Sequence, residues 1–163
     1  MAVDTNLNQF KQSAAVGDLD LSFFGAENVI TVLFDPTDTT HKVYGGQGVS
    51  LKDLGADDSS GAPIVGYRAA DTASIFGVRV RSLKDAYTEG KGLMEVAIDG
   101  AVMWFKASAA LNRGVKVSLV FGTPGSVQAA GTKAYLGYTL DKVSSGGMVR
   151  VMLRCDAVTA GTT

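Results

Sequence analysis

The sequence predicts an all-β protein, an antiparallel β-barrel or sandwich of about eight to ten short strands with short helical turns between them. Three observations lead to this fold class. Short apolar runs recur at nearly regular spacing, and turn residues separate them. No predicted helix is long enough to cover a parallel sheet, which argues against an α/β fold. Twenty glycines and only three prolines indicate many tight turns rather than a disordered linker.

The length sets the expected domain organisation. A chain of 163 residues is one ordinary domain, and such a chain buries about 70% of its unfolded surface. We expect a single barrel domain over residues 25–157, an N-terminal arm or extension over residues 1–24, and a frayed tail over residues 158–163. The first twenty residues are polar and aperiodic, and Phe10 and Lys11 are their only large or basic features. The arm is therefore expected to order against a partner.

The first strands are marked by their composition. Residues 19–24 alternate before a glycine, and residues 28–34 are β-branched and almost wholly apolar, which predicts a buried strand. The Asp35-Pro36 pair ends that strand with a type I turn. Three later segments begin with a Ser cap and end with Gly, which predicts short helical turns. They are residues 50–55, 82–90 and 108–114.

Asp99-Gly100 gives the strongest local signal, a β-hairpin between two apolar runs. With those two residues as the loop, one face of the hairpin is wholly apolar. Its predicted pairs are Ile98 with Ala101, Val96 with Met103, and Met94 with Phe105. The other face is mixed and carries Leu93, Glu95, Ala97, Val102, Trp104 and Lys106. A shift of one residue would destroy this separation, so the pattern predicts the register firmly.

The remaining strands follow from alternation and turn residues. We expect strands over residues 64–69, 74–81 and 115–121, and a final pair over residues 135–140 and 148–153. The predicted inward side chains of the last three are Val115, Val117, Leu119, Phe121, Leu136, Tyr138, Leu140, Val149, Val151 and Leu153. All the phenylalanines that lie in apolar runs are expected in the core: Phe23, Phe24, Phe34, Phe76, Phe105 and Phe121.

The sequence offers few candidates for chemistry. His41 is the single histidine, and no G-x-S-x-G motif accompanies it. Asp57 and Asp58 are neighbours in a loop, so their side chains diverge. The glycine-rich residues 45–48 lack the Lys-Ser/Thr that follows a phosphate-binding loop. We therefore expect no enzyme, no metal and no cofactor, and we interpret the lone Cys155 as a buried thiol.

Charge and hydropathy restrict the expected partners. The formal net charge is -1, with no basic stripe for nucleic acid. No apolar run approaches the roughly 20 residues of a membrane helix, and residues 1–10 lack the features of a secretory signal. We therefore expect an intracellular product without nucleic-acid or membrane partners. The arginines at strand faces and ends are expected to pair with carboxylates of the chain or of a neighbour: Arg79, Arg81, Arg113, Arg150 and Arg154.

Residues 61–153 resemble the capsid decoration, or cement, proteins of tailed bacteriophages, a family of small, head-stabilising β-barrel proteins. The matching features are residues 61–64 (GAPI), 76–78 (FGV), 95–97 (EVA) with Gly100, 109–111 (AAL) before Gly114, 125–127 (GSV), 136–138 (LGY) and 149–151 (VRV). The last motif departs modestly from the family, because residues 136–139 (LGYT) replace its late IGxA-like strand. The resemblance leaves the first 60 residues unexplained.

The resemblance implies a structural virion protein, made in the host cytoplasm, that binds the outer surface of the capsid. Its implied partners are the major capsid protein and neighbouring copies of itself, often as a homotrimer that bridges capsomers. The candidate contact residues are Phe10, Lys11, Phe23, Phe24, Glu95, Trp104 and Lys106. The alternative is a soluble β-barrel module for host attachment or carbohydrate recognition, for which Trp104 with Glu95 is the one candidate pair.

Overall fold

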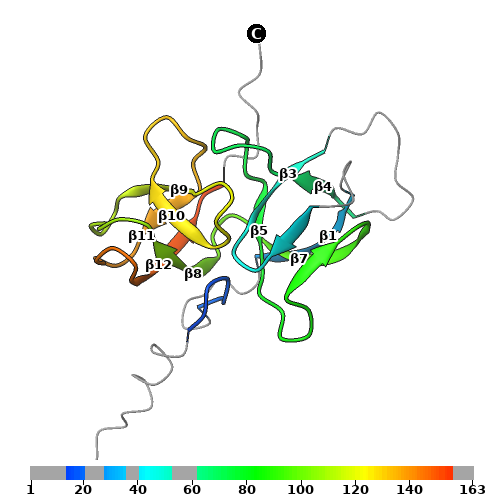
Figure 1. Ribbon diagram of the computed structural model, residues 1–163, viewed down its shortest axis with the longest axis horizontal. Helices are drawn as coiled ribbons and strands as arrows, with labels where there is room; N and C mark the ends of the chain where they lie inside the picture. Colours follow the sequence, from blue (N-terminus) through cyan, green and yellow to red (C-terminus); the bar gives the residue numbers. More distant parts are fainter. Residues whose placement is uncertain (1–13, 21–27, 36–40, 53–61, 156–163) are drawn as a thin grey trace, which may run out of the picture.

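The computed structural model describes residues 14–20, 28–35, 41–52 and 62–155. In these residues the chain forms twelve β-strands and no helix, which confirms the all-β fold class. Ten strands build two closed five-stranded barrels, and two strands form a separate ribbon (Figure 1). The strands are thus more numerous than the eight to ten expected, and they enclose two cores instead of one.

The first barrel has the strand order β1-β4-β3-β5-β7. Its strands are β1 (Val29–Phe34), β3 (Gly48–Leu51), β4 (Ile64–Tyr67), β5 (Gly77–Arg79) and β7 (Gly92–Ala97). β1 pairs with β7 in antiparallel fashion over its whole length, and it pairs with β4 in parallel. Alternation places the even-numbered side chains of β1 inward, where Val32 and Phe34 are fully buried. They pack with Val43, Val49, Val65, Met94 and Val96.

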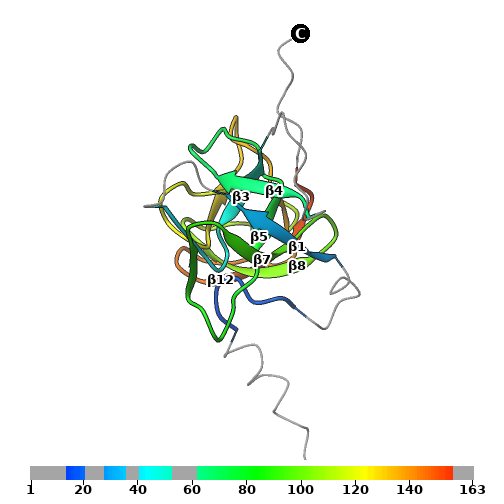
Figure 2. The ribbon, with the colours of Figure 1, turned by 90° about the vertical axis from the view of Figure 1, so that its right-hand side faces the viewer.

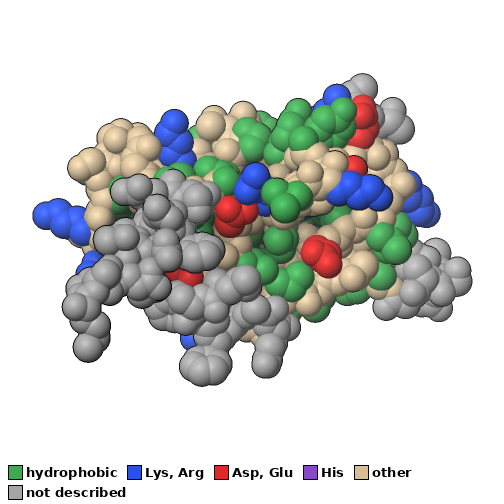
Figure 3. Space-filling view, turned by 90° about the horizontal axis from the view of Figure 1, so that it is seen from below, with side chains coloured by type: hydrophobic (Ala, Val, Ile, Leu, Met, Phe, Trp, Pro, Cys, Tyr) green, Lys and Arg blue, Asp and Glu red, His purple; other side chains and the backbone are tan. Residues whose placement is uncertain are grey.

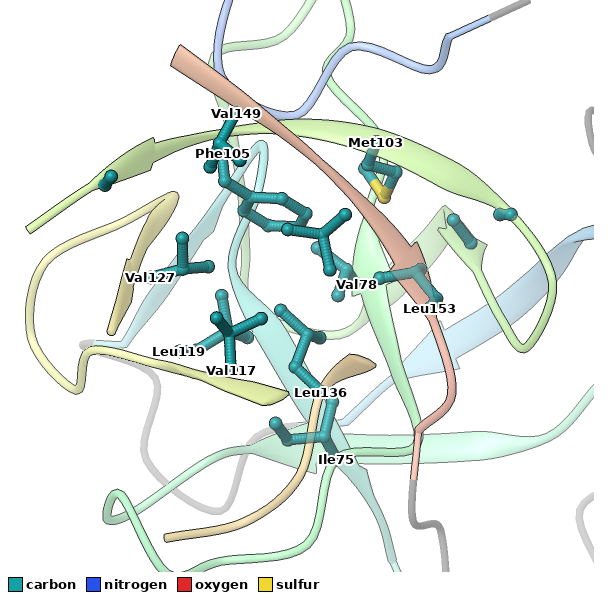
Figure 4. Packing of buried hydrophobic residues seen from close by; sticks show 14 of the residues in the cluster. Ile75, Val78, Met103, Phe105, Val117, Leu119, Val127, Leu136, Val149 and Leu153 are labelled. Atoms are coloured by element: carbon teal, nitrogen blue, oxygen red, sulfur yellow. The ribbon is translucent and has the colours of Figure 1, made fainter. Parts of the chain in front are cut away.

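The second barrel has the order β10-β8-β12-β11-β9. Its strands are β8 (Val102–Ala107), β9 (Lys116–Leu119), β10 (Ser126–Ala129), β11 (Gly137–Thr139) and β12 (Met148–Leu153). Phe105 is fully buried at its centre, surrounded by side chains from every strand of the barrel except β11 and by Leu136, which directly precedes β11 (Figure 4). Val117, Leu119, Val149, Val151 and Leu153 are buried as predicted. The β8–β10 pair is parallel, so neither barrel is purely antiparallel.

The ribbon consists of β2 (Lys42–Tyr44) and β6 (Tyr87–Glu89), which pair in antiparallel fashion. Val43 reaches from it into the first core and is fully buried. The view in Figure 2 places the first barrel in front of the second. The ribbon is the one sheet in the described part of the chain that is not closed into a barrel.

The predicted hairpin at Asp99-Gly100 is wrong in its pairing, although the turn is present. Gly100 has a φ of 87°, and the Ala101 N–H donates to the Ile98 carbonyl over 3.2 Å. However, β7 pairs with β1 and β5, whereas β8 pairs with β12 and β10. The turn therefore carries the chain from one barrel to the other. The apolar side chains Met94 and Val96 of β7 pack in the first core, and Met103 and Phe105 of β8 pack in the second.

Three further expectations are corrected. Residues 82–90 and 108–114 contain bends, turns and strand or bridge residues rather than helical turns, and in residues 50–55 the first two belong to β3 while 53–55 lie outside the described residues. β11 turns Gly137 and Thr139 inward, so Tyr138 faces out and donates its hydroxyl to the Met152 sulfur over 2.8 Å. Phe121 follows β9 and is 44% exposed. The described residues contain no helix that could span a membrane.

Candidate interaction surface

Residues 14–20, which we call the strap, lie across both barrels. The Gly17 N–H donates to the Trp104 carbonyl, the Trp104 N–H to the Asp18 carbonyl, and the Asp20 N–H to the Val102 carbonyl, over 2.8, 2.9 and 2.8 Å. The strap thus pairs with residues 102–104 of β8, next to residues 106–107, which pair with β10. The Arg81 N–H, just after β5, donates to the Gly17 carbonyl over 3.0 Å. This part of the predicted arm is therefore bound to the chain's own two barrels.

Glycines allow the strap to approach closely. A Cβ on Gly17 would lie 2.5 Å from the Gly46 nitrogen and 2.7 Å from the Gly45 carbonyl carbon, and Gly17 has a φ of 82°. Gly125, in the turn before β10, leaves room for the side chain of Val16 in the same way. Because the nearest atoms around Gly17 are backbone, a larger residue cannot be accommodated by a rotamer change.

Two ion pairs fix the strap on either side. Arg150 of β12 bonds Asp141 over 2.7 Å and Asp20 of the strap over 3.2 Å, and all three side chains are mostly buried. The hydrogen bond to Asp141 raises the pKa of Arg150, so its charge is permanent. On the first barrel's side, Arg81 bonds Asp18 over 3.1 Å in a more exposed pair. Both arginines pair with carboxylates, as expected from the sequence.

A second contact joins the barrels away from the strap. Arg68, just after β4, is 4% exposed and donates to the carbonyls of Ala73 and Asp71. It also donates to the carbonyl of Leu119 of β9, across the boundary between the two barrels, which we call the seam. Burial lowers its pKa. The Asp71 carboxylate accepts the Phe121 N–H over 2.6 Å and the Gln128 amide over 3.3 Å. The seam is therefore held on both sides.

The predicted contact residues are dispersed over this surface. Trp104 is half-buried, with the Arg150 guanidinium 5.7 Å from its ring centroid and the strap on its backbone. Glu95 is exposed on β7 and lies opposite Thr31, and Lys106 is exposed on β8 opposite Met148. Trp104 and Glu95 belong to different barrels, so they are not the cross-strand pair expected of a sugar site. The candidates Phe10, Lys11, Phe23 and Phe24 lie outside the described residues.

Of the remaining sequence candidates, the structure describes His41 and the glycine-rich residues 45–48. Three of the glycine-rich residues, 46–48, border a hollow between the barrels whose other wall includes Arg68 and residues 119–123. Its volume of about 10 Å³ admits roughly one water molecule. His41 stacks on Tyr67, with ring centroids 4.2 Å apart. Among the described residues, no group of three or more His, Cys, Asp or Glu side chains is placed to hold a metal ion. Asp57 and Asp58 lie outside those residues.

Sequence reasoning missed the exposed apolar residues around the ribbon except Leu93, which it placed on the mixed face of the hairpin. Leu83, in the β5–β6 loop (residues 80–86), is 91% exposed, and Leu93 of β7 is 64% exposed. Tyr44 and Tyr87 face each other across the ribbon, with ring centroids 5.5 Å apart. Ser82 does cap backbone N–H groups, those of Lys84 and Asp85, but in a bent loop and not in the helical turn that its pattern predicts. For Arg113 and Arg154, no ion pair with a carboxylate of the described residues is present.

No protein-family model matches the chain, and no curated protein matches it. Among solved structures, the chain is similar to the head fiber gp8.5 N base in bacteriophage phi29. The two share 12% sequence identity and a TM-score of 0.49, and the match covers 77% of this chain and 93% of that chain.

Proposed function

We propose that the chain is a structural virion protein of a tailed bacteriophage that binds the outer surface of the capsid and stabilises the shell by bridging capsomers. The sequence resemblance over residues 61–153 supports this role, and one observation of the structure agrees with it. Both barrels are closed, and the seam between them is held by the strap on one side and by Arg68 and Asp71 on the other. We therefore expect the two barrels of the described residues to move as one rigid block.

A stiff block suits a reinforcing role for a physical reason. A protein that bridges two subunits resists their separation only if its own two halves do not move apart. A preorganised surface also loses little conformational entropy when it binds. Because a shell presents the same site many times, contacts that are individually weak add up across the lattice.

The proposed partners are the major capsid protein and further copies of the chain, arranged as a homotrimer on the capsid exterior. Of the proposed contact residues, Glu95 and Lys106 are exposed on strands of different barrels. Trp104 offers only part of its ring, because Arg150 and the strap lie against it. The proposal assigns the chain no catalytic role and no cofactor.

Co-sedimentation with purified expanded capsids of the phage that encodes the chain tests the proposal. We expect the full-length chain to pellet with the capsids and to stay in the supernatant without them. Size-exclusion chromatography of the free chain, with light scattering, tests the trimer separately. A chain that stays in the supernatant beside capsids but is retained on a glycan column would contradict the proposal and favour the carbohydrate-binding alternative.

A further inference from the structure

The two barrels have the same strand topology. In each barrel, the first strand along the chain pairs in parallel with the third and in antiparallel fashion with the fifth: β1 with β4 and β7, and β8 with β10 and β12. The second strand pairs with the third and the fourth, and the fourth pairs with the fifth, all in antiparallel fashion. Figure 1 shows the two barrels side by side. Each strand of the first barrel therefore has one counterpart in the second.

The residue registers of the two barrels also correspond. Thr31 of β1 lies opposite Glu95 of β7, and Trp104, at the same position in β8, lies opposite Arg150 of β12. The remaining strand pairs give the same correspondence: Phe34–Val65 with Ala107–Val127, Leu51–Val65 with Leu119–Val127, Val49–Gly77 with Val117–Gly137, and Arg79–Val96 with Thr139–Val151. A slip of one residue in any pair would turn a strand's side chains to the other face, so agreement around the whole ring is a strict condition.

The correspondence extends beyond the barrel strands. In the ribbon Val43 lies opposite Thr88, and in the second barrel Leu111 and Val143 form an isolated bridge. Val43 and Leu111 precede the second strand of their barrel by the same number of residues. Both side chains are buried, each in the core of its own barrel. The ribbon is therefore the longer form of a bridge that both barrels contain.

Backbone hydrogen bonds outside the strand ladders match in the same way. The Gly46 N–H donates to the Arg79 carbonyl and the Gly114 N–H to the Thr139 carbonyl, both over 2.8 Å, and the two glycines have φ angles of 79° and 76°. Further matching bonds run from Lys52 to Ile64 and Val120 to Ser126, from Phe76 to Val49 and Leu136 to Val117, and from Val80 to Glu95 and Leu140 to Arg150. The sequence itself repeats in β3 and β9, as Val-Ser-Leu at residues 49–51 and 117–119. A shared topology alone does not require equal turns and equal bonds, so the two barrels match as whole units.

The surfaces of the two barrels differ, although their backbones match. Glu95 is exposed, whereas its counterpart Arg150 is mostly buried between Asp20 and Asp141. On the face shown in Figure 3, acidic and basic side chains are dispersed among hydrophobic ones. The match is thus one of backbone and core.

One connection of the first barrel is longer than its counterpart. β5 leads to the ribbon through Arg79 to Thr88, and the matching segment of the second barrel runs from Thr139 to Val143. Residues 82–86 therefore have no counterpart in the second barrel. Arg79 stands in the place of Thr139, and both residues are buried.

Arg79 supports these additional residues from within the barrel. It is 4% exposed, and it donates to the Asp85 carbonyl over 3.1 Å and to the Thr88 hydroxyl over 3.0 Å. Its Nη1 has no partner among the described residues. The expected carboxylate partner of Arg79 is wrong, because neutral oxygens accept these bonds, and burial lowers its pKa. A cation buried without a carboxylate destabilises a fold, so the arginine is accounted for by the segment that it holds and not by the barrel.

We infer that the two barrels are tandem copies of one structural unit and that residues 82–86 are an addition to the first unit. Arg79 is the positioning residue that holds this addition, where the second unit closes around Thr139. The inference is independent of the proposed function, and it explains why a chain of single-domain length contains two cores.

Variants of the full-length chain test both parts of this inference: deletion of residues 82–86, Arg79→Thr, and the two combined. We expect the combined variant to fold, because its connection then has the length and the buried residue of the second barrel. Urea unfolding should show one cooperative transition, both by circular dichroism and by the fluorescence of Trp104. Deletion of residues 82–87 is the control, because it leaves a connection shorter than that of the second barrel and should lower the urea midpoint further.

The unmodified chain and the three variants form a double-mutant cycle for Arg79. The deletion removes the Asp85 carbonyl, so the guanidinium loses an acceptor while it stays buried. Arg79→Thr raises the unfolding equilibrium constant by some factor in the intact chain. We expect that factor to be at least about threefold smaller in the deletion variant.

Each part of the inference has its own contrary result. A combined variant without a cooperative transition would show that residues 82–86 belong to the barrel itself, which overturns the tandem units. Equal urea midpoints for the deletions of residues 82–86 and 82–87 would contradict the matched length of the two connections. Equal factors for Arg79→Thr in the two backgrounds would overturn the positioning role of Arg79. None of these measurements involves capsids, so the proposed function is tested separately.

Discussion

Replacing Gly17 with alanine should release the strap from the two barrels. Two costs add at this position. An L-residue with a φ of 82° costs roughly 1–2 kcal/mol, and pushing a methyl group against backbone atoms costs about 1–3 kcal/mol more. The alternative for the chain is to detach the strap, which loses four backbone hydrogen bonds worth about 1 kcal/mol each. Either route lowers the free energy of unfolding by about 2–5 kcal/mol.

Gly114→Ala is the matched control for this change. Gly114 also has a positive φ, of 76°, but a Cβ there meets no atom within 4 Å. It should therefore cost only the backbone term, roughly 1–2 kcal/mol. The difference between the two variants isolates the contact of the strap with residues 45 and 46.

Urea unfolding followed by the fluorescence of Trp104, the one tryptophan, measures both variants. Hydrogen exchange adds a local signal, because the Trp104 N–H donates to the Asp18 carbonyl of the strap and should exchange faster in Gly17→Ala than in Gly114→Ala. If the two variants were equally stable and their Trp104 amides equally protected, the strap would not be the clamp that we describe.

Three further predictions concern the partly buried Cys155, the arginine ion pairs and the buried Phe34. Burial raises the pKa of Cys155 to about 12 from 9.0, so the thiol loses its proton at lower pH in the unfolded chain than in the folded chain. The free energy of unfolding should therefore fall by about 1.4 kcal/mol per pH unit above pH 9. Cys155→Ala should remove this slope in urea titrations. Arg150→Met should cost about 3–5 kcal/mol, because two mostly buried carboxylates lose their cation, whereas Arg81→Met, in the more exposed pair, should cost less than about 1 kcal/mol. Phe34→Ala should lower the free energy of unfolding by about 3–5 kcal/mol. The unfolding midpoint measured by the fluorescence of Trp104, in the other barrel, should fall by the same amount as the midpoint measured by circular dichroism.

Each of these predictions has a contrary result. A pH slope above 9 that is equal with and without the thiol would show that Cys155 is not buried in the folded state. Equal costs for the two arginine variants would show that solvent screens both pairs alike. Separate fluorescence and dichroism midpoints in Phe34→Ala would show that the barrels unfold independently, contrary to a locked seam.

The sequence predicted local structure better than strand pairing. Asp99-Gly100 specifies a turn, because glycine readily adopts the φ of 87° that the turn requires. The apolar face of Met94 and Val96 does not specify its partner, since any apolar strand of similar length satisfies it. In the fold, the six residues of β1 match β7 along its full length, and β12 matches β8. Alternation therefore identified the strands but not the division into two barrels.

For the interaction surface, the sequence predicts a contact only where a residue type favours one kind of partner, as an arginine favours a carboxylate. Arg150 is expected to pair with carboxylates and does, whereas the more deeply buried Arg79, for which the same is expected, donates to the Thr88 hydroxyl and the Asp85 carbonyl instead. Phe121 was expected in the core, yet its N–H binds Asp71 in a seam contact that depends on tertiary structure. The exposure of Leu83 and the location of Trp104 beside the strap depend in the same way on segments far apart in the chain, so no local pattern predicts them.

Cryo-electron microscopy of capsids with and without the chain tests the central proposal most directly. We predict additional density on the outer surface of the expanded shell, at the junctions between capsomers, into which the two-barrel block fits as one rigid body. Identical maps with and without the chain, or density on the inner surface, would contradict the assignment as a decoration protein.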